Sequence, residues 1–295
     1  LLAEAERYPH VRVMAVPGFD YGFAAFNFRS PSDAARPHPV LADLAMRRAL
    51  TMAIDRASAV RTVLGPAALP SFGPFVRAQV TADTTIPQIA FDRAEAERLL
   101  DSLGWRRGAD GLRARGASPL RLTILSPTSS ATRMRLAAVL QEQWRAAGVD
   151  VRVEGLEFQT FLERMGSGRF DIALNAWRTT PSPRGIRSTW GSERIAGGSR
   201  QNAGRYTSDR FDEAVLAALA TVNPQERIGA FRRAYRIAVE DAPALWLYEA
   251  RSVIAVHNRF TIPAWRTDAW WLTIPDWSLA RDRALPRDAA PTPAP

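Results

Sequence analysis

The sequence predicts an α/β fold in which helices flank a central mixed, mainly parallel sheet. Strand and helix patterns alternate from residue 120 to residue 177, and this β-α-β-α-β order implies parallel strands joined by right-handed crossovers. The composition agrees, because 46% of the 295 residues are hydrophobic and 23% are charged. The 18 glycines and 21 prolines are close to the average share, which excludes collagen-like and low-complexity chains. This length predicts two domains or one large domain.

The individual elements are predicted from apolar spacing, turn residues and capping residues. Pro17-Gly18 separates two short strands, and residues 40–64 form one long amphipathic helix or a pair. Asp92 and Asn223 stand at helix-capping positions. In order, the predicted elements are strands at 12–16 and 21–27, helices at 40–64 and 92–103, a strand at 120–125, a helix at 131–147, a strand at 149–153, a helix at 158–165, a strand at 170–176, helices at 208–220 and 223–241, and a strand pair at 244–248 and 252–256.

The charge pattern argues against nucleic acid as a partner. All 39 basic residues are arginine, and the formal net charge is +9. A nucleic-acid-binding module concentrates its basic residues in a patch or stripe, whereas here the arginines alternate with acids, as in residues 92–98. We therefore expect a solvated surface of mixed charge. A basic nucleic-acid-binding module is the alternative, and it requires a continuous arginine stripe.

Several kinds of chemistry have no support in the sequence. The lack of cysteine excludes disulfides, thiolate metal sites and cysteine nucleophiles. His10, His38 and His257 are far apart and have no partners at metal-ligand spacing, so surface or structural roles are expected. Nucleophile-elbow, phosphate-loop and dinucleotide-binding motifs are absent. We expect no catalytic residues, no metal and no cofactor.

The start of the chain does not read as a targeting segment. No apolar run approaches the roughly 18 residues of a membrane span. The first eight residues lack the basic start and apolar centre of a signal peptide, and they resemble the interior of a helix. We therefore expect the chain to be a fragment of a longer protein.

The carboxyl ends of the predicted parallel strands are the expected ligand position. These ends are residues 126–130, 154–157 and 177–180. The third end is the most informative, because Trp177 offers a stacking face while Arg178 and Thr180 offer hydrogen-bond donors. The alternative is that Trp177 only covers the edge of the sheet.

The C-terminal region from residue 259 to residue 279 is rich in tryptophan. We expect its tryptophans to be anchors buried against another lobe, because large aromatic side chains are more often interior than displayed. The alternative is a stacking platform of a carbohydrate-active hydrolase or a sugar-binding module, and the hydrolase requires two carboxylates facing one cleft. The four side chains are Trp265, Trp270, Trp271 and Trp277.

Read in order, several segments resemble the family 5 extracellular solute-binding proteins, the oligopeptide-, dipeptide- and nickel-binding receptors of ABC importers. Residues 44–56 (LAMRRALTMAIDR) are similar to the family's VRQALNYAIDR helix, and residues 91–105 (FDRAEAERLLDSLGW) to its YDPEKAKALLAEAGW helix. Residues 169–177 resemble its YDM…W strand, and residues 202–212 its NxxxYSNPEFD segment. The resemblance runs from about residue 21 to residue 256, and more loosely to residue 277.

The resemblance implies one lobe of a periplasmic-binding-protein type II fold, in which two lobes close on a solute. Residues 1–37 would belong to an incomplete first lobe, 38–257 would form the complete C-terminal lobe, 258–285 would return to the first lobe, and 286–295 would be a Pro/Ala-rich, mobile tail. The implied protein is not an enzyme. It is the substrate-binding component of an ABC importer, which delivers a small-molecule or peptide ligand to a membrane permease; a sensor's ligand-binding domain is an alternative. A monomer, exported to the periplasm or cell surface by a signal peptide upstream of this fragment, is expected.

The resemblance also carries over part of a ligand site. In peptide-binding members, the tryptophan at the strand exit is followed three positions later by an aspartate that pairs with the ligand's α-ammonium. Trp177 matches that tryptophan, but Thr180 replaces the aspartate and Arg178 adds a positive charge, so a neutral or anionic ligand is expected. Tyr21 and Tyr248, near the lobe junction, are further candidates. Nickel is not expected, because no histidine falls in this loop.

Overall fold

A six-stranded sheet organises the part of the chain that the computed structural model describes, which comprises residues 7–194, 201–279 and 282. The strand order is β2-β9-β1-β8-β6-β7. β6 pairs in parallel with β7 and β8, whereas β1 pairs antiparallel with β8 and β9, and β2 pairs antiparallel with β9. The bounds are β1 Val11–Phe26, β2 Ala68–Pro70, β6 Arg121–Pro127, β7 Asp150–Leu156, β8 Ile172–Arg178 and β9 Ala244–His257.

The strand directions confirm a mixed sheet, but the expectation that it is mainly parallel is wrong, because three of its five described ladders are antiparallel and two are parallel. β6, β7, β8 and β9 all run in one direction, and β1 is inserted between β8 and β9 in the opposite direction. The short edge strand β2 also runs opposite to β9. Parallel hydrogen-bond ladders are therefore confined, among the described strands, to the predicted β-α-β-α-β unit.

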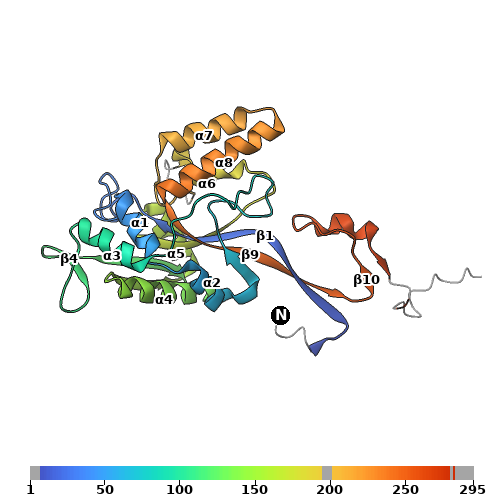
Figure 1. Cartoon of the computed structure of the whole chain (residues 1–295), viewed down its shortest axis with the longest axis horizontal. Coiled ribbons are helices and arrows are strands. Elements are labelled where there is room, and N and C mark those ends of the chain that lie inside the picture. Colours follow the sequence, from blue (N-terminus) through green and yellow to red (C-terminus); the bar gives the residue numbers. More distant parts are fainter. Residues whose placement is uncertain (1–6, 195–200, 280–281, 283–295) are drawn as a thin grey trace, which may run out of the picture.

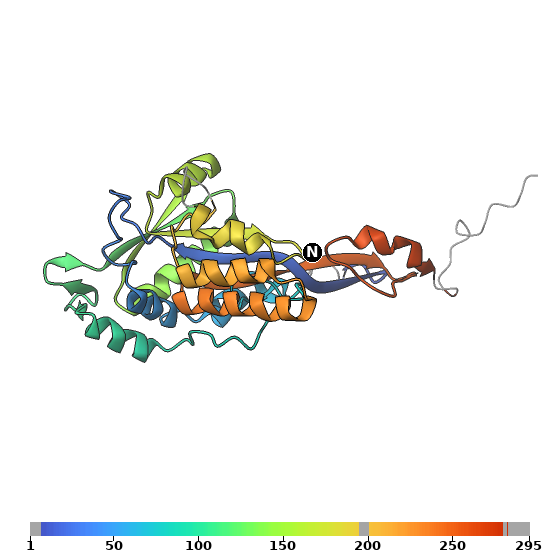
Figure 2. The same ribbon diagram turned by 90° about the horizontal axis from the view of Figure 1, so that it is seen from above.

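Helices cover both faces of this sheet (Figure 1, Figure 2). Ala24 and Phe26 of β1 pack in the cluster that contains α1 to α4, whereas Phe23 and Ala25 pack in the cluster that contains α6 to α8. α5 packs on β6 through Phe161. The helices are α1 Leu44–Met52, α2 Arg56–Leu64, α3 Arg93–Ser102, α4 Ala131–Ala146, α5 Phe158–Ser167, α6 Gly185–Trp190, α7 Asp209–Ala220 and α8 Pro224–Asp241. Smaller elements are η2 Gly65–Ala67, η3 Ser192–Arg194, and a three-stranded sheet of β3 Arg106–Arg107, β4 Arg113–Arg115 and β5 Ser118–Pro119.

The predicted capping residues begin the helices where expected. The Asp92 carboxylate accepts a hydrogen bond from the Glu95 N–H at 2.9 Å, and the Asn223 side chain accepts one from the Gln225 N–H at 2.9 Å. Residues 40–64 are a pair of helices, because the Asp55 carboxylate caps a new start by accepting from the Ser58 N–H.

The two predicted strand pairs are each one continuous strand. We expected Pro17-Gly18 to end a strand, but β1 continues through it, with a register shift against β9 between Pro17 and Tyr21. A proline is tolerated at such an irregularity because the ladder is already interrupted there. Gly18 is required by close approach, since a Cβ at this position would lie 2.4 Å from the Ala250 carbonyl oxygen.

Beyond Pro17 and Arg251, β1 and β9 leave the helical layers as a two-stranded ribbon (Figure 1, Figure 2). At its end lie the β10–β11 pair (Phe260–Thr261 and Ser278–Leu279) and the 3-10 helix η4 (Trp270–Asp276). Trp270 and Trp271 are 43% and 56% exposed, because η4 stands apart from both helical layers. These two side chains are not buried by the described residues, so burial against another lobe remains a prediction. The tail 286–295 and the first six residues lie outside the described residues.

Arg47 of α1 joins the segment before α1 to the end of α8. Its guanidinium is buried and donates to the carbonyls of Leu41, Ala42, Asp241 and Ala242 at 2.8–3.0 Å. It also lies 4.1 Å from the ring centroid of Phe28, within cation–π range. Burial lowers the pKa of Arg47 to about 10, so the side chain is still charged at neutral pH.

Replacing Arg47 with methionine should lower the free energy of unfolding by about 3 kcal/mol or more. The substitution leaves four backbone carbonyls without their donor, and each buried unsatisfied group costs roughly 1–3 kcal/mol. The matched control is Arg48→Met, whose exposed side chain makes one 3.3 Å bond and should cost no more than about 0.5 kcal/mol. Urea unfolding followed by circular dichroism measures both, and equal losses would contradict the assignment.

Candidate ligand site

The carboxyl end of β8 opens into a cavity of about 270 Å³, which we call the strand-exit cavity. Its place agrees with the rule that ligands bind beyond the carboxyl ends of parallel strands. Its walls come from the middle of β1, the end of β8, the loop after β8, α6, α8 and the segment after β2. The lining residues are Tyr21, Pro74, Gln79, Trp177, Arg178, Thr179, Thr180, Pro183, Gly185, Ile186, Ser188, Thr189, Gln201 and Tyr235. The structure therefore brings together four of the five predicted residues.

Tyr21 and Trp177 are neighbours across the β1–β8 ladder. Tyr21 is 2% exposed, and its hydroxyl accepts a hydrogen bond from the Trp190 indole N–H at 3.0 Å. Burial raises the pKa of Tyr21 far above its usual value, so the phenol stays neutral. Trp177 is half-buried and lies at the rim of the same aromatic cluster. The two rings thus give the cavity a neutral aromatic wall.

The two polar candidates after Trp177 are both already engaged. Arg178 forms an ion pair with Asp20 at 3.2 Å, so its positive charge is balanced in the structure. The Thr180 hydroxyl donates to the Ser182 carbonyl at 3.2 Å. Because the Arg178 side chain is 70% exposed, its ion pair contributes little stability and can be exchanged for another anion at low cost.

Tyr248 does not reach the strand-exit cavity. It packs on the opposite face of the sheet, in the cluster that contains α1 to α4. The reason is a second register shift, in which Gly22 pairs with Tyr248 and Phe23 with Trp246, so that Leu247 has no residue opposite it. This bulge places Leu247 and Tyr248 on one face. The tyrosine ring covers Gly22, where a Cβ would lie 2.1 Å from the ring.

Sequence reasoning missed Gln79, which lines the cavity from outside the predicted loop, and Glu249, which lies beside the cavity residue Tyr21 on the neighbouring strand. The Gln79 amide donates to the Thr180 carbonyl at 2.8 Å and to the Thr179 hydroxyl at 3.1 Å. Glu249, opposite Tyr21 in the ladder, forms a 2.7 Å ion pair with Arg77. Glu249 is buried although strand β9 is otherwise apolar here, and a lone acid in an apolar strand was the only available signal.

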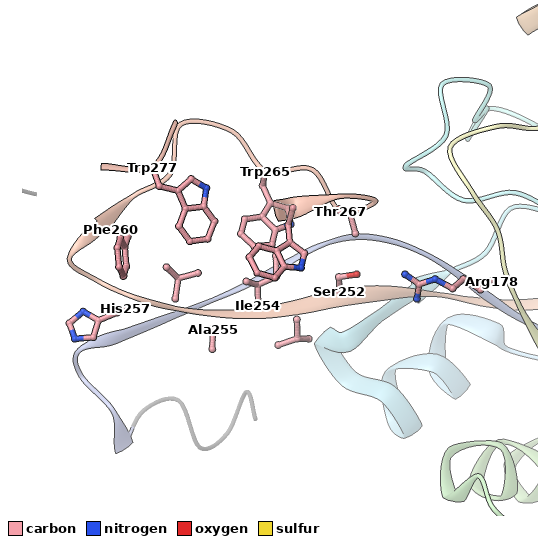
Figure 3. A pocket seen from close by; sticks show the side chains of 12 residues that line it. Arg178, Ser252, Ile254, Ala255, His257, Phe260, Trp265, Thr267 and Trp277 are labelled. Atoms are coloured by element: carbon pink, nitrogen blue, oxygen red, sulfur yellow. The ribbon is translucent and has the colours of Figure 1, made fainter. Parts of the chain in front are cut away.

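A larger cavity of about 620 Å³, the ribbon cavity, lies between β9 and the tryptophan-rich end. Figure 3 shows Arg178 at one end and Phe260 and Trp277 at the other. The rings of Trp265 and Trp270 stack with their centroids 6.2 Å apart. Arg178 lines both cavities, so the two hollows meet at the point where the ribbon leaves the sheet.

The histidines have structural surroundings. The buried His38 ring accepts from the Leu41 N–H through Nδ1 and contacts the Asp171 carboxylate through Nε2 at 3.0 Å. His10 and His257, distant in sequence, lie across the ribbon with their ring centroids 5.2 Å apart. Within the described ranges, no group of three or more potential ligands is arranged to hold a metal ion. The helices in those ranges also include none with the length and apolar character needed to cross a bilayer.

A mixed sheet covered by helices on both faces, with a ligand-sized cavity at a strand exit, is the fold of the type II periplasmic binding proteins. The sequence model of the bacterial extracellular solute-binding proteins, family 5, middle region, matches residues 2–197. The chain therefore belongs to the family 5 extracellular solute-binding proteins, which confirms the resemblance drawn from its motifs. This membership gives no support to the hydrolase alternative.

Relatives and solved structures agree with this placement. Protein XP55 of Streptomyces lividans is 30% identical over 202 residues, covering 68% of this chain and 36% of that protein. Di/tripeptide-binding protein 2 of Pseudomonas aeruginosa is 24% identical and covers 90% and 46%. The oligopeptide-binding protein AppA of Bacillus subtilis, solved with a nonapeptide, superimposes with a TM-score of 0.77 at 20% identity, covering 95% and 54%. The chain spans less than half of the length of the first two of these relatives and about half of the solved AppA chain.

Glu249 makes a pH-dependent contribution to stability whose sign follows from its surroundings. Burial raises the pKa of Glu249 above its usual value of 4.5, against the opposing effect of Arg77. The folded state then holds the proton more tightly than the unfolded state, so the stability that protonation gives is present below 4.5 and is lost as the pH rises through the raised pKa. We predict that the free energy of unfolding of the wild type, minus that of Glu249→Gln, falls as the pH rises over this window. Urea titrations across this window test the sign, and a difference that rises with pH would mean that the ion pair outweighs burial.

Proposed function

We propose that this chain is the ligand-binding C-terminal part of a substrate-binding component of an ABC importer, which captures a small solute between two lobes and delivers it to a membrane permease. Family membership supports the class of protein. The strand-exit cavity carries the assignment to this chain, because it lies at the carboxyl end of β8, where ligands bind in open α/β sheets. Closure about a hinge, stabilised by contacts of the ligand to both lobes, is the proposed mechanism.

The proposed lobe boundaries follow the strands. Residues 38–257 would form the C-terminal lobe, and residues 1–37 and 258–285 would contribute to the first lobe. Because residues 20–26 pair with β8 inside the six-stranded sheet, we place the crossing between lobes at the Pro17–Tyr21 register shift, inside the first segment. Relatives named as periplasmic, such as the periplasmic oligopeptide-binding protein OppA of Haemophilus influenzae, support an exported protein, and we propose that it acts as a monomer.

The chemistry of the cavity supports a neutral or anionic solute. Arg178 is the one charged side chain among the residues that line the strand-exit cavity, and the remaining polar groups are hydroxyls and amides. Thr180 cannot neutralise an ammonium group in a desolvated cleft, whereas Arg178 can release Asp20 and bind an anionic group. A sensor's ligand-binding domain would use the same cavity. The described arginines form ion pairs in several separate regions, including Arg121–Asp150 and Arg210–Glu240, which does not favour a nucleic-acid stripe.

Native mass spectrometry of the full-length protein, purified from its own host, tests the proposed function. We expect a bound neutral or anionic compound of small mass. The 295-residue chain purified in the same way is the control, and it should carry little ligand because it offers only one wall of the cleft. Recovery of a free-amine peptide would contradict the inference from Thr180. A bound compound that the protein itself has produced by catalysis would contradict the proposed solute-binding function.

Restoring a carboxylate at position 180 should change the ligand preference. In the full-length protein, Thr180→Asp should gain at least about tenfold in affinity for trialanine, since a charge-assisted hydrogen bond contributes roughly 1.5–3 kcal/mol. Thr180→Asn, of the same shape without the charge, is the matched control and should gain little. Isothermal titration calorimetry measures both, and equal affinities in the two variants would place the peptide ammonium elsewhere.

A further inference from the structure

Gln79 holds the backbone of the loop that follows β8. Its side chain is only 5% exposed although it lies in a long connecting segment. The amide nitrogen donates to the carbonyl of Thr180 at 2.8 Å and to the hydroxyl of Thr179 at 3.1 Å, with a longer 3.4 Å contact to the Ser182 carbonyl. The amide oxygen accepts from the Val76 N–H at 3.3 Å. Gln79 therefore fixes the cavity loop to the turn at residues 76–79.

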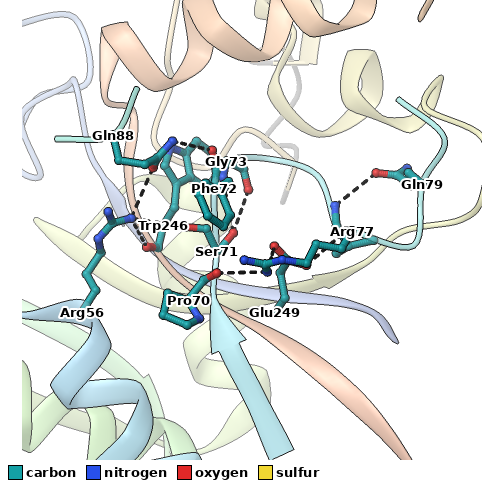
Figure 4. Close-up of polar contacts among 11 residues, drawn as sticks. Arg56, Pro70, Ser71, Phe72, Gly73, Arg77, Gln79, Gln88, Trp246 and Glu249 are labelled. Atoms are coloured by element: carbon teal, nitrogen blue, oxygen red, sulfur yellow. Dashed lines mark hydrogen bonds and ion pairs between the residues drawn. The ribbon is translucent and has the colours of Figure 1, made fainter. Parts of the chain in front are cut away.

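The same turn is attached to β9 through Arg77. The Arg77 N–H donates to one carboxylate oxygen of Glu249 at 2.8 Å, and the guanidinium donates to the other at 2.7 Å (Figure 4). The guanidinium also reaches the Pro70 carbonyl at 3.2 Å and lies 4.6 Å from the Phe72 ring centroid. Glu249 stands beside the Pro17–Tyr21 register shift, where β9 passes into the ribbon.

The segment that leads from β2 into this turn, residues 70–77, is braced as well. Arg56 donates to the Ser71 carbonyl at 3.3 Å and to the Trp246 carbonyl at 3.1 Å. Gln88 donates to the Phe72 carbonyl at 3.0 Å, as Figure 4 shows. Because Arg77 and Gln79 belong to one turn and the segment before it is also held, a displacement of β9 at Glu249 cannot leave the Gln79 contacts unchanged without breaking polar contacts.

We propose that residues 70–79 form a strut that couples the position of β9, at its exit from the sheet, to the shape of the strand-exit cavity. Glu249 and Arg77 are its attachment to β9, and Gln79 is its attachment to the loop of Thr179 and Thr180. These three are positioning residues. The inference rests on the proposed hinge closure, because β9 is one of the two strands that cross between the lobes. A bend of β9 at Glu249 would move the loop after Trp177, and ligand in the cavity would in turn hold β9.

Hydrogen exchange of the ligand-free, full-length protein tests the strut. Gln79→Ala and Glu249→Gln should each raise the exchange rate of amides in residues 177–186 about fivefold, the effect of losing one hydrogen bond of typical strength. Peptides from α4 and β6 should be unchanged. Glu240→Gln is the matched control, because it removes the exposed ion pair with Arg210 and should leave residues 177–186 as in the wild type. Because no ligand is added, this result is independent of whether the protein binds a solute.

The double variant distinguishes a coupled strut from two separate stabilising contacts. If Glu249 acts through Gln79, the double variant should exchange as fast as Gln79→Ala alone, whereas independent contacts give the product of the two effects. The product, or no change at residues 177–186 in Glu249→Gln, overturns the proposal. If Glu249→Gln does not fold, Arg77→Gln removes the same ion pair by changing its more exposed partner, and the same results support or overturn the proposal.

The ¹⁹F resonance of Trp177 in protein labelled with 5-fluorotryptophan is a second measurement. It should shift in either ion-pair variant, whereas the resonance of the core residue Trp144 should not. An unshifted Trp177 resonance also overturns the strut.

Discussion

The antiparallel pairing of β1 with β9 is the constraint on which the rest of the structure depends. The ladder runs from Val11 opposite His257 to Ala25 opposite Ala244, so it joins the two ends of the described chain. Closing so long a loop has an entropic cost, which grows slowly with loop length and is offset by aromatic burial. Tyr21, Phe23 and Trp246 supply that burial in one cluster. With β1 fixed, β8 and then β6 have a template to pair against.

The irregularities in this ladder decide which side chains reach the cavity. The shift between Pro17 and Tyr21 lets both strands leave the sheet as a ribbon, and the unpaired Leu247 turns Tyr248 to the other face. Without the second shift, Tyr248 would share a face with Trp246, because side chains alternate along a regular strand. Glu249 returns to the face of Tyr21, where Arg77 meets it. One extra residue in β9 thus puts Tyr248 on the face of α1 to α4 and Glu249 on the face of Tyr21.

Local signals in the sequence predicted much of the fold, and non-local pairing limited the rest. The caps at Asp92 and Asn223 and the β-α-β-α-β unit were predictable, because a capping side chain and an apolar period act within a few residues. The insertion of β1 between β8 and β9 depends on contacts across most of the chain, which no local pattern encodes. The family motif indicated Trp177 and its loop. Gln79 was missed because its role comes from reaching Thr180, a hundred residues away in sequence.

The charges near the cavity explain its neutral character. Arg178 is balanced by Asp20 and Arg77 by Glu249, so the two acids nearest to the aromatic wall already serve arginines. A ligand ammonium would have to displace one of these arginines, and the buried Glu249 pair resists this more strongly than the exposed Asp20 pair. A ligand anion needs only to replace Asp20 at Arg178, in contact with solvent. Either ligand could break the exposed Arg178–Asp20 pair, so the proposed preference for an anion depends on Arg178 lining the strand-exit cavity while Asp20 is not among its lining residues.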